Sequence, residues 1–170
     1  MTGMSAVSVD ILVESPLWAA ADADTTVRAA LATAADAVRA LPAAGGVTVV
    51  LTDVEAIRKL NRDWRHVDKP TNVLSFPAAQ LPMPERREEA VVPATLGDLV
   101  IAYETTVREA AAEEKPVAHH VAHLAVHGFL HLLGYDHESD EEADEMERLE
   151  ATILARLNIP DPYVTRPSAA

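Results

Sequence analysis

The sequence predicts a single domain of the α/β (α+β) class built around one small sheet. The chain has 170 residues and a hydrophobic content of 49%, which suits one globular domain with a sizeable core. Patterns typical of secondary structure follow the order strand, helix, strand, helix, strand, strand and then three helices. No internal repeat interrupts this order. It favours strands that share one sheet, with the helices packed against it.

Two strands flank an alanine-rich helix in the first third of the chain. Residues 7–13 alternate over part of their length, and residues 47–52 are rich in β-branched side chains, so both are predicted strands. The second strand is expected to be central in the sheet. Between them a helix is expected to run to about Ala40, with Thr25 or Thr26 as its N-cap.

The middle of the chain is expected to hold a basic helix, two more strands and a long loop. Asp53 is the predicted N-cap of the helix, and a strand over residues 72–76 follows it, stopped by Pro77. Residues 77–95 contain four prolines and are expected to form a loop of a length that is usually functional or mobile. The last strand is predicted over residues 99–103. The basic helix that Asp53 caps is expected to turn four apolar side chains to the core, namely Val54, Ile57, Leu60 and Trp64.

Three helices complete the predicted domain. One is expected over residues 104–114 and a second, apolar at nearly every position, over residues 117–133. Ser139 opens a capping-box pattern that predicts the start of the third, which runs to about Leu157. The resulting boundaries are a loose N-terminus at 1–6, the domain at 7–157 and an irregular tail at 158–170.

Composition indicates a soluble cytoplasmic protein that has no disulfide partner. The chain contains no cysteine, so any transition-metal site must use histidine or carboxylate ligands. The N-terminus lacks a basic region, and Asp10 and Glu14 interrupt its apolar residues, so no signal peptide is expected. The long apolar helix contains histidines and is too short to span a bilayer comfortably. No association with a membrane is therefore expected.

The stretch His127-Gly-Phe-Leu-His131-Leu-Leu-Gly-Tyr-Asp-His137 concentrates the chemistry of the chain. His127 and His131 are four residues apart on a predicted helix, so both imidazoles project from one face about one turn apart. Gly134 suits a left-handed turn that ends the helix and lets His137 fold back toward the pair. Three imidazoles with one open position are typical of a catalytic zinc site. One Zn²⁺ per chain is therefore predicted.

Spacing alone leaves the choice of ligands open. Histidines occur at positions 119, 123, 127 and 131, so three pairs are geometrically alike. The pair at 127 and 131 is favoured because it lies nearest the turn that returns His137. His123 is then a candidate buried partner of the site, and Asp136 either orients a ligand imidazole or only stabilises the turn. His119 and His120 are expected to face solvent near the start of the helix.

Three blocks of the sequence carry a resemblance to a known family. They are HLAVHGFLHLLGYDH at 123–137, LNRDWRHVDKPTNVLSFP at 60–77 and LGDLVIAYET at 96–105. Together they resemble the signature of the YbeY family of bacterial ribosomal RNA maturation factors, over roughly residues 45–157. One departure is Asn72, where many members of the family carry aspartate.

The resemblance implies both a fold and an activity. The implied fold is a mixed four-stranded sheet packed by about five helices, with a metal site at the end of a buried central helix. The implied zinc ligands are His127, His131 and His137, and the implied catalytic arginine is Arg65. The implied activity is that of a metal-dependent endoribonuclease specific for single strands, which acts in 3′-end maturation of 16S ribosomal RNA and in ribosome quality control. The implied partners are the small ribosomal subunit and its RNA.

The net charge of −13 is distributed unevenly along the chain. Residues 138–150 hold eight acidic side chains and one arginine and are expected to form a solvated helix face. Residues 58–69 carry a net charge of +3 instead. Phosphate contacts favour a basic surface. The candidate contacts with an RNA backbone are therefore Arg58, Lys59, Arg62 and Lys69.

Phosphodiester cleavage requires a group that binds the anionic phosphate and stabilises developing charge. A guanidinium can do both through two parallel hydrogen bonds. Arg65 is the first candidate for this role and His66 is the second. Both water and the RNA 2′-hydroxyl remain open as the attacking nucleophile.

Two alternatives to a nuclease fit a site of three histidines. The first is a non-catalytic ribosome-assembly protein in which zinc only stabilises the fold. The second is a zinc peptidase, whose HExxH motif has a general-base glutamate directly after the first histidine. Here that position is Gly128, which argues against the peptidase.

Overall fold

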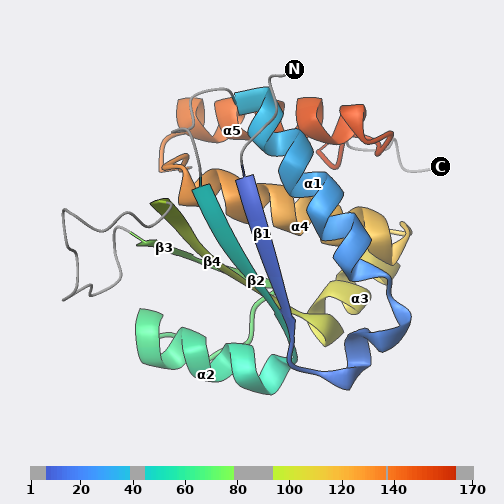
Figure 1. The fold of residues 1–170 in the computed structure, drawn as a ribbon, viewed down its shortest axis with the longest axis vertical. Coiled ribbons are helices and arrows are strands. Elements are labelled where there is room, and N and C mark those ends of the chain that lie inside the picture. The colour runs from blue at the N-terminus through green and yellow to red at the C-terminus, as the bar shows by residue number, and fades with distance from the viewer. Residues whose placement is uncertain (1–6, 39–44, 79–93, 137, 164–170) are drawn as a thin grey trace.

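One mixed sheet of four strands organises the chain (Figure 1). The computed structural model describes residues 7–38, 45–78, 94–136 and 138–163. The strands lie in the order β1-β2-β4-β3, with β3 antiparallel to β4 and the other two pairs parallel. The strands are β1 (Val7–Val13), β2 (Gly45–Thr52), β3 (Val73–Pro77) and β4 (Ala94–Ala102). The helices are the 3-10 helix η1 (Pro16–Ala20), α1 (Ala23–Val38), α2 (Val54–Arg65), α3 (Tyr103–Ala112), α4 (Val117–Leu132) and α5 (Asp140–Arg156).

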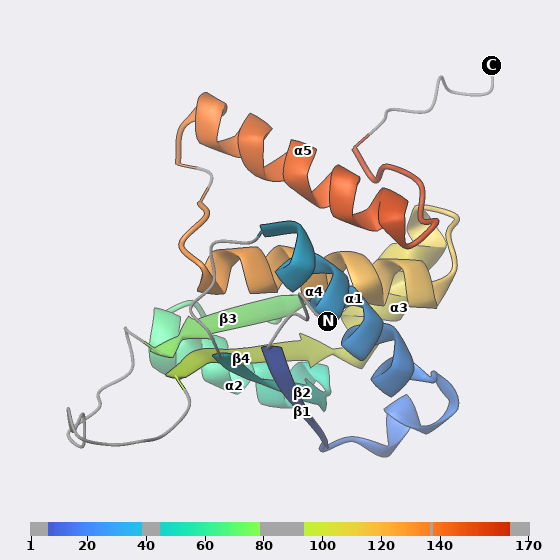
Figure 2. The same cartoon turned by 45° about the horizontal axis from the view of Figure 1, so that its top comes forward.

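The helices form layers on both faces of the sheet (Figure 2). Helix α2 packs on one face, α1 and α4 pack on the other, and α5 lies outside α1 and α4. The larger core cluster fills the second side and includes Leu31, Leu99 and Phe129. A smaller cluster lies under α2 and includes Ile57 and Leu74. The predicted class, a single α/β domain with a mixed four-stranded sheet and five α-helices in the described residues, is confirmed.

The enclosed position of α4 explains its composition. It contacts β3 and β4 on one side and α1, α3 and α5 on others, so most of its surface is buried and must be apolar. The histidines of this helix share its enclosed position and need polar partners, His120 being buried and the other four half-buried. His120 is only 3% exposed, so the prediction that it faces solvent was wrong. No helix in the described ranges is long and apolar enough to cross a membrane.

Two predicted helix caps are present in the structure. The Asp53 side chain accepts a hydrogen bond of 2.9 Å from the Ala56 N–H, and the Ser139 hydroxyl accepts one of 3.1 Å from the Glu142 N–H. Each such cap stabilises a helix by about 1 kcal/mol. The threonine cap predicted for α1 was wrong, because α1 begins at Ala23 and already includes both threonines. Its predicted end at Ala40 lies outside the described residues.

Strand β4 begins five residues before the predicted start at Leu99 and ends before Tyr103, which opens α3. The pair Gly97 and Asp98 resembles a loop in sequence, yet it pairs with β2 and β3. A bulge accounts for the difference, because the pairing with β2 shifts by one residue at this point. Gly97 has φ +139°, and a Cβ there would lie 2.3 Å from the Phe76 carbonyl oxygen. Only glycine fits this position.

Asp98 allows a test of stability against pH. Burial raises the pKa of its carboxyl, so the protonated form favours the folded chain, and this contribution is lost as pH rises through the folded-state pKa. Asp98→Asn, which is neutral at every pH, is expected to raise the melting temperature at pH 7. The difference should vanish below about pH 3, where the aspartate is also neutral. A lower melting temperature of the variant at pH 7 would show that the charged carboxylate stabilises the fold.

Candidate metal centre

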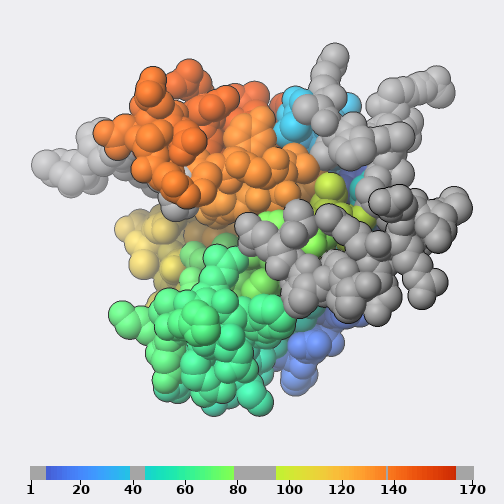
Figure 3. All heavy atoms as spheres, turned by 90° about the vertical axis from the view of Figure 1, so that its left-hand side faces the viewer, coloured from blue at the N-terminus to red at the C-terminus, as the bar shows by residue number. Residues whose placement is uncertain are grey.

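A cavity of about 780 Å³ opens between α4 and the edge strand β3. Four of the histidines on α4 line one wall, and the residues around β3 line the other. Arg65, at the end of α2, also reaches this cavity. In the space-filling view, α2 (green) lies below α4 and α5 (orange) on this side of the molecule (Figure 3). The histidines are His120, His123, His127 and His131.

The Nε2 atoms of His127 and His131 lie close together in the cavity. Their Nε2 atoms are 3.1 Å apart, and the ring centroids are 4.6 Å apart at an interplanar angle of 82°. The other ring nitrogen of each histidine contacts an acceptor. His127 Nδ1–H donates to Glu150 Oε2 at 2.7 Å, and His131 Nδ1–H donates to the Tyr135 carbonyl oxygen at 2.9 Å. Both contacts fix the tautomer that leaves a lone pair on Nε2.

This donor set fits a zinc ion. Two neutral imidazoles whose Nε2 lone pairs converge cannot hydrogen-bond to each other, whereas a cation between them satisfies both. Nitrogens bound to tetrahedral zinc lie about 3.3 Å from each other, close to the observed 3.1 Å. Metal-ligating histidines commonly donate their second N–H to a carboxylate or a carbonyl. His127 donates to a carboxylate and His131 donates to a carbonyl oxygen.

The predicted third ligand, His137, lies outside the described residues. Among the residues that the structure describes, no group of three metal-ligating side chains comes together. The assignment of His127, His131 and His137 as a set therefore stays a prediction. Gly134 adopts φ +102°, the left-handed turn that was expected to end the helix. Asp136, two residues further on, lines the same cavity.

Glu150 is the residue of this site that the sequence did not reveal. It was expected on a solvated face of α5, yet its side chain is fully buried. Burial raises the pKa of this carboxyl, but hydrogen bonds from His123 and His127 outweigh burial and lower the pKa to about 2. Glu150 is therefore an ionised acceptor at neutral pH. One signal was available, because position 150 falls within the apolar stripe of α5 at helical spacing from Met146 and Ile153.

Two further groups bind the Glu150 carboxylate. His123 Nε2–H donates to Oε1 at 2.9 Å, and the Tyr163 hydroxyl donates to the same oxygen. Burial and the neighbouring carboxylate raise the pKa of Tyr163, so its hydroxyl stays protonated. His123 thus contacts the predicted ligand His127 through a shared carboxylate. His123 is half-buried, and its role as a partner of the metal site stays a prediction.

Arg65 reaches the cavity around the open edge of the sheet. Its Nη2 donates to the carbonyl oxygen of Ser75 in the edge strand β3. Its guanidinium carbon lies 5.6 Å from the centroid of the Phe76 ring. Both contacts hold the planar group at the mouth of the cavity. The structure thus brings the predicted arginine to the same cavity as two of the predicted ligands, His127 and His131.

The other candidate residues occupy different places. His66 ends α2 in the left-handed conformation, with φ 61°, and it is not among the described residues that line the cavity. The candidate RNA contacts are exposed, but two of them already have partners. Arg58 pairs with Asp68 at 2.8 Å, and Arg62 pairs with Asp63 at 3.1 Å. Lys59 and Lys69 are exposed as well.

Asn72 lines the cavity beside β3 and belongs to a polar network that extends to α4. Its Nδ2 donates to Glu109 Oε1 at 2.9 Å, and its Oδ1 accepts from the Val73 N–H at 2.6 Å. Strand β3 begins at Val73, so Asn72 lies just before the strand and not within it as predicted. His120 Nε2–H donates to the same Glu109 oxygen at 2.8 Å. Burial lowers the pKa of His120, which favours its neutral form.

Gly128 faces the sheet and not the cavity. A Cβ at this position would lie 2.8 Å from Leu99 Cδ2 and 3.2 Å from Ser75 Oγ. The Ser75 hydroxyl donates to the Gly128 carbonyl oxygen at 3.1 Å. A glutamate side chain there would require at least the Leu99 and Ser75 side chains to shift. Packing as well as sequence therefore disfavours the peptidase motif at this position.

Taken together, these features define a small α/β protein with paired histidines and an arginine at one cavity. The family model described as "YbeY: Endoribonuclease YbeY" matches residues 14–158. A relative from Bradyrhizobium diazoefficiens named Endoribonuclease YbeY is 54% identical, over 93% of this chain and 86% of the relative. One of the same name from Rhodopseudomonas palustris is also 54% identical, over 96% of this chain and 84% of the relative. The chain therefore belongs to the YbeY family, and the resemblance in its sequence is confirmed.

A solved structure shares the fold at low sequence identity. It is the solution structure of TM1509 from Thermotoga maritima, which is 21% identical and covers 95% of this chain and 99% of its own. The TM-score is 0.56. At this identity the likeness supports the fold alone.

Proposed function

We propose that the protein is a zinc-dependent endoribonuclease that cuts single-stranded RNA during ribosomal RNA processing. Maturation of the 3′ end of 16S ribosomal RNA and ribosome quality control are its proposed roles, in the cytoplasm. The observation that carries this proposal is that Arg65 and the pair His127 and His131 line one cavity. Membership of a family whose relatives are named endoribonucleases supports the reaction class.

The proposed zinc ligands are His127, His131 and His137. When bound, zinc would supply a Lewis acid for a phosphoryl oxygen and would lower the pKa of a coordinated water. Contacts within the chain already orient two of these ligands without the metal. Glu150 and the Tyr135 carbonyl oxygen hold the Nδ1 protons of two ligands, so that each presents Nε2 to the cavity.

Arg65 is the proposed phosphate-binding group. Its guanidinium is planar, always charged and able to donate two parallel hydrogen bonds to phosphate oxygens. The Ser75 carbonyl oxygen and the Phe76 ring position it without neutralising its charge. Because a phosphodiester gains negative charge at its equatorial oxygens as the nucleophile attacks, a cation placed there in advance lowers the barrier.

The proposed partners are single-stranded RNA and the small ribosomal subunit with its RNA. The acidic helix α5 and the basic helix α2 lie on opposite sides of the sheet and α4 layers, so the net charge of −13 does not surround the cavity evenly. Exposed Lys59 and Lys69 are the proposed contacts for flanking phosphates. Arg58 and Arg62 would first have to exchange their carboxylate partners for phosphate.

A cleavage assay tests this function. Zinc-loaded protein is expected to cut single-stranded RNA, and His131→Ala protein purified identically is expected not to. Unstructured peptides should stay intact in the same buffer. Equal RNA cleavage by the two proteins would point to a contaminating nuclease and contradict the proposal. Peptide hydrolysis that disappears with His131→Ala would show that the protein is a peptidase and not a nuclease.

A further inference from the structure

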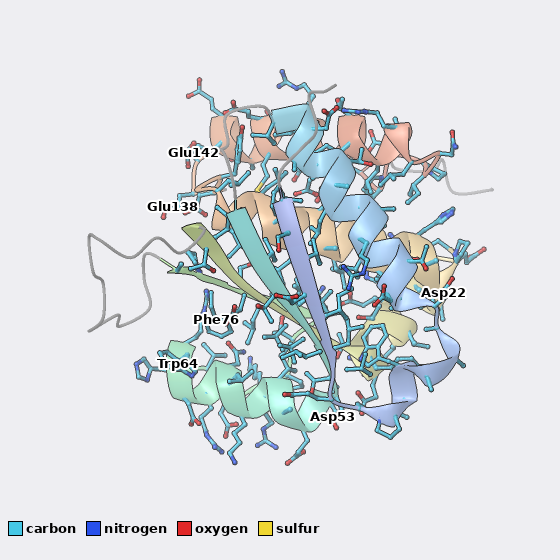
Figure 4. The ribbon with its side chains drawn as sticks, in the orientation of Figure 1. Asp22, Asp53, Trp64, Phe76, Glu138 and Glu142 are labelled. Atoms are coloured by element: carbon cyan, nitrogen blue, oxygen red, sulfur yellow. The ribbon has the colours of Figure 1, made fainter. Side chains whose placement is uncertain are left out.

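Trp64 is an exposed aromatic residue beside the candidate active site. It was predicted to face the core, but it is 53% exposed. Its ring packs edge-on against Phe76, with centroids 6.1 Å apart and an interplanar angle of 68°. Figure 4 shows the two side chains close together, Trp64 from α2 and Phe76 from β3. The chain has only two tryptophans, and the other, Trp18, is 3% exposed.

The aromatic pair and the metal cavity lie on opposite sides of one edge strand. Ser75 in β3 faces α4, where its hydroxyl bonds the Gly128 carbonyl oxygen. The next residue, Phe76, faces the other way and packs against the small core under α2, as alternation along a strand requires. Arg65 joins the two sides, because it lines the cavity and also lies over the Phe76 ring. An extended polymer that leaves the cavity past Arg65 would next meet Trp64.

The hollow beside Trp64 suits a flat ring with N–H donors. It has a volume of about 330 Å³, and its walls are mostly apolar: Val50, Leu60, Trp64, Phe76 and Val100. Its polar lining consists of two carboxylates, Glu14 and Asp98. Asp98 lies directly across from Phe76 in the β3–β4 pairing. Carboxylates repel a phosphate but accept hydrogen bonds from the amino groups of nucleobases. Apolar and aromatic walls favour stacking of a base.

We propose that Trp64 and Phe76 form a stacking subsite for one base of a single-stranded RNA whose backbone passes Arg65. The subsite rests on the proposed endoribonuclease function and adds where the substrate strand runs. Bases of a double helix are already stacked on each other and cannot enter it, so the subsite selects for single strands. One unstacked base on a tryptophan is a common means of holding such strands.

Fluorescence titration of the full-length, zinc-loaded protein tests this subsite. The probe is a single-stranded 2′-O-methyl phosphorothioate RNA of ten nucleotides, which resists cleavage. Binding is expected to quench the emission of exposed Trp64, while buried Trp18 supplies the remaining signal. Trp64→Ala should weaken binding by about 5- to 150-fold, the range for loss of one stacked base. Trp64→Phe should retain most of the affinity, since a ring remains.

Controls separate this subsite from the proposed function. Leu17→Ala removes another exposed apolar side chain, 44% exposed in η1, and should bind RNA as the wild type does. An equal affinity of Trp64→Ala and wild-type protein, without quenching, would overturn the subsite. A dimer that is lost in Trp64→Ala protein, with RNA affinity unchanged, would assign the surface to a second copy of the chain and also overturn it. Failure of wild-type protein to cleave RNA would instead contradict the proposed function.

Discussion

Replacing Arg65 by alanine is expected to slow cleavage of single-stranded RNA by about 10²- to 10³-fold under single-turnover conditions. That loss is typical when one group that stabilises transition-state charge is removed. Arg65→Lys should not restore full activity, because an ammonium cannot reproduce the two parallel hydrogen bonds of a guanidinium. The measurement is the rate of strand cleavage at saturating protein, with zinc content determined on the same sample.

Two comparisons separate catalysis from folding and from general RNA affinity. Arg65 is exposed, so loss of its contacts with Ser75 and Phe76 should cost no more than about 1 kcal/mol in unfolding free energy. Lys59→Ala should weaken RNA binding modestly and flatten its dependence on salt. Lys59 is a cleaner control than Arg58, which is paired with Asp68. Wild-type cleavage by Arg65→Ala would show that Arg65 is not catalytic.

Replacing Glu150 by glutamine is expected to weaken zinc binding by about 10- to 100-fold, the usual effect of losing a group that orients a ligand histidine. The carboxylate is fully buried and accepts from His127 Nδ1 at 2.7 Å. A neutral amide accepts more weakly and no longer favours the positive charge of the bound metal. Competition with a chelator of known affinity measures the change.

Spectra of the metal-free protein distinguish a loss of His127 orientation by Glu150 from a general loss of structure. Long-range ¹H–¹⁵N spectra of the metal-free protein should show His127 protonated at Nδ1 in the wild type and mixed in Glu150→Leu, where the acceptor is gone. Glu147→Gln provides the matched control, since Glu147 is exposed on the same helix and should change neither the spectrum nor the zinc affinity. Unchanged zinc affinity in Glu150→Gln would show that Glu150 does not support the metal.

Structural features that depend on residues close together in the chain could be predicted from the sequence. Caps depend on a side chain and a backbone N–H three residues away, so Asp53 and Ser139 could be identified directly. The apolar helix α4 and the spacing of His127 and His131 follow from helical periodicity alone. The class of fold followed from the order of the elements.

Features that depend on distant partners were not predictable. Glu150 is an ordinary member of an acidic run until α5 docks on α4 and brings His123 and His127 to it. Gly97 resembles a loop residue unless the Phe76 carbonyl oxygen beside it is known. Trp64 occupies a core-facing position by helical periodicity, but the structure leaves it 53% exposed beside Phe76. In each case a tertiary contact decided what local propensity left open.

Metal analysis of purified protein tests the zinc centre most directly. The wild type is expected to hold about one zinc per chain, with weaker binding below about pH 6, where protonated imidazole cannot bind a metal. The variant His127→Ala/His131→Ala should lose nearly all of it, whereas His119→Ala should remain fully loaded. Equal zinc content in the double variant and the wild type would contradict the histidine site and the cleavage mechanism built on it.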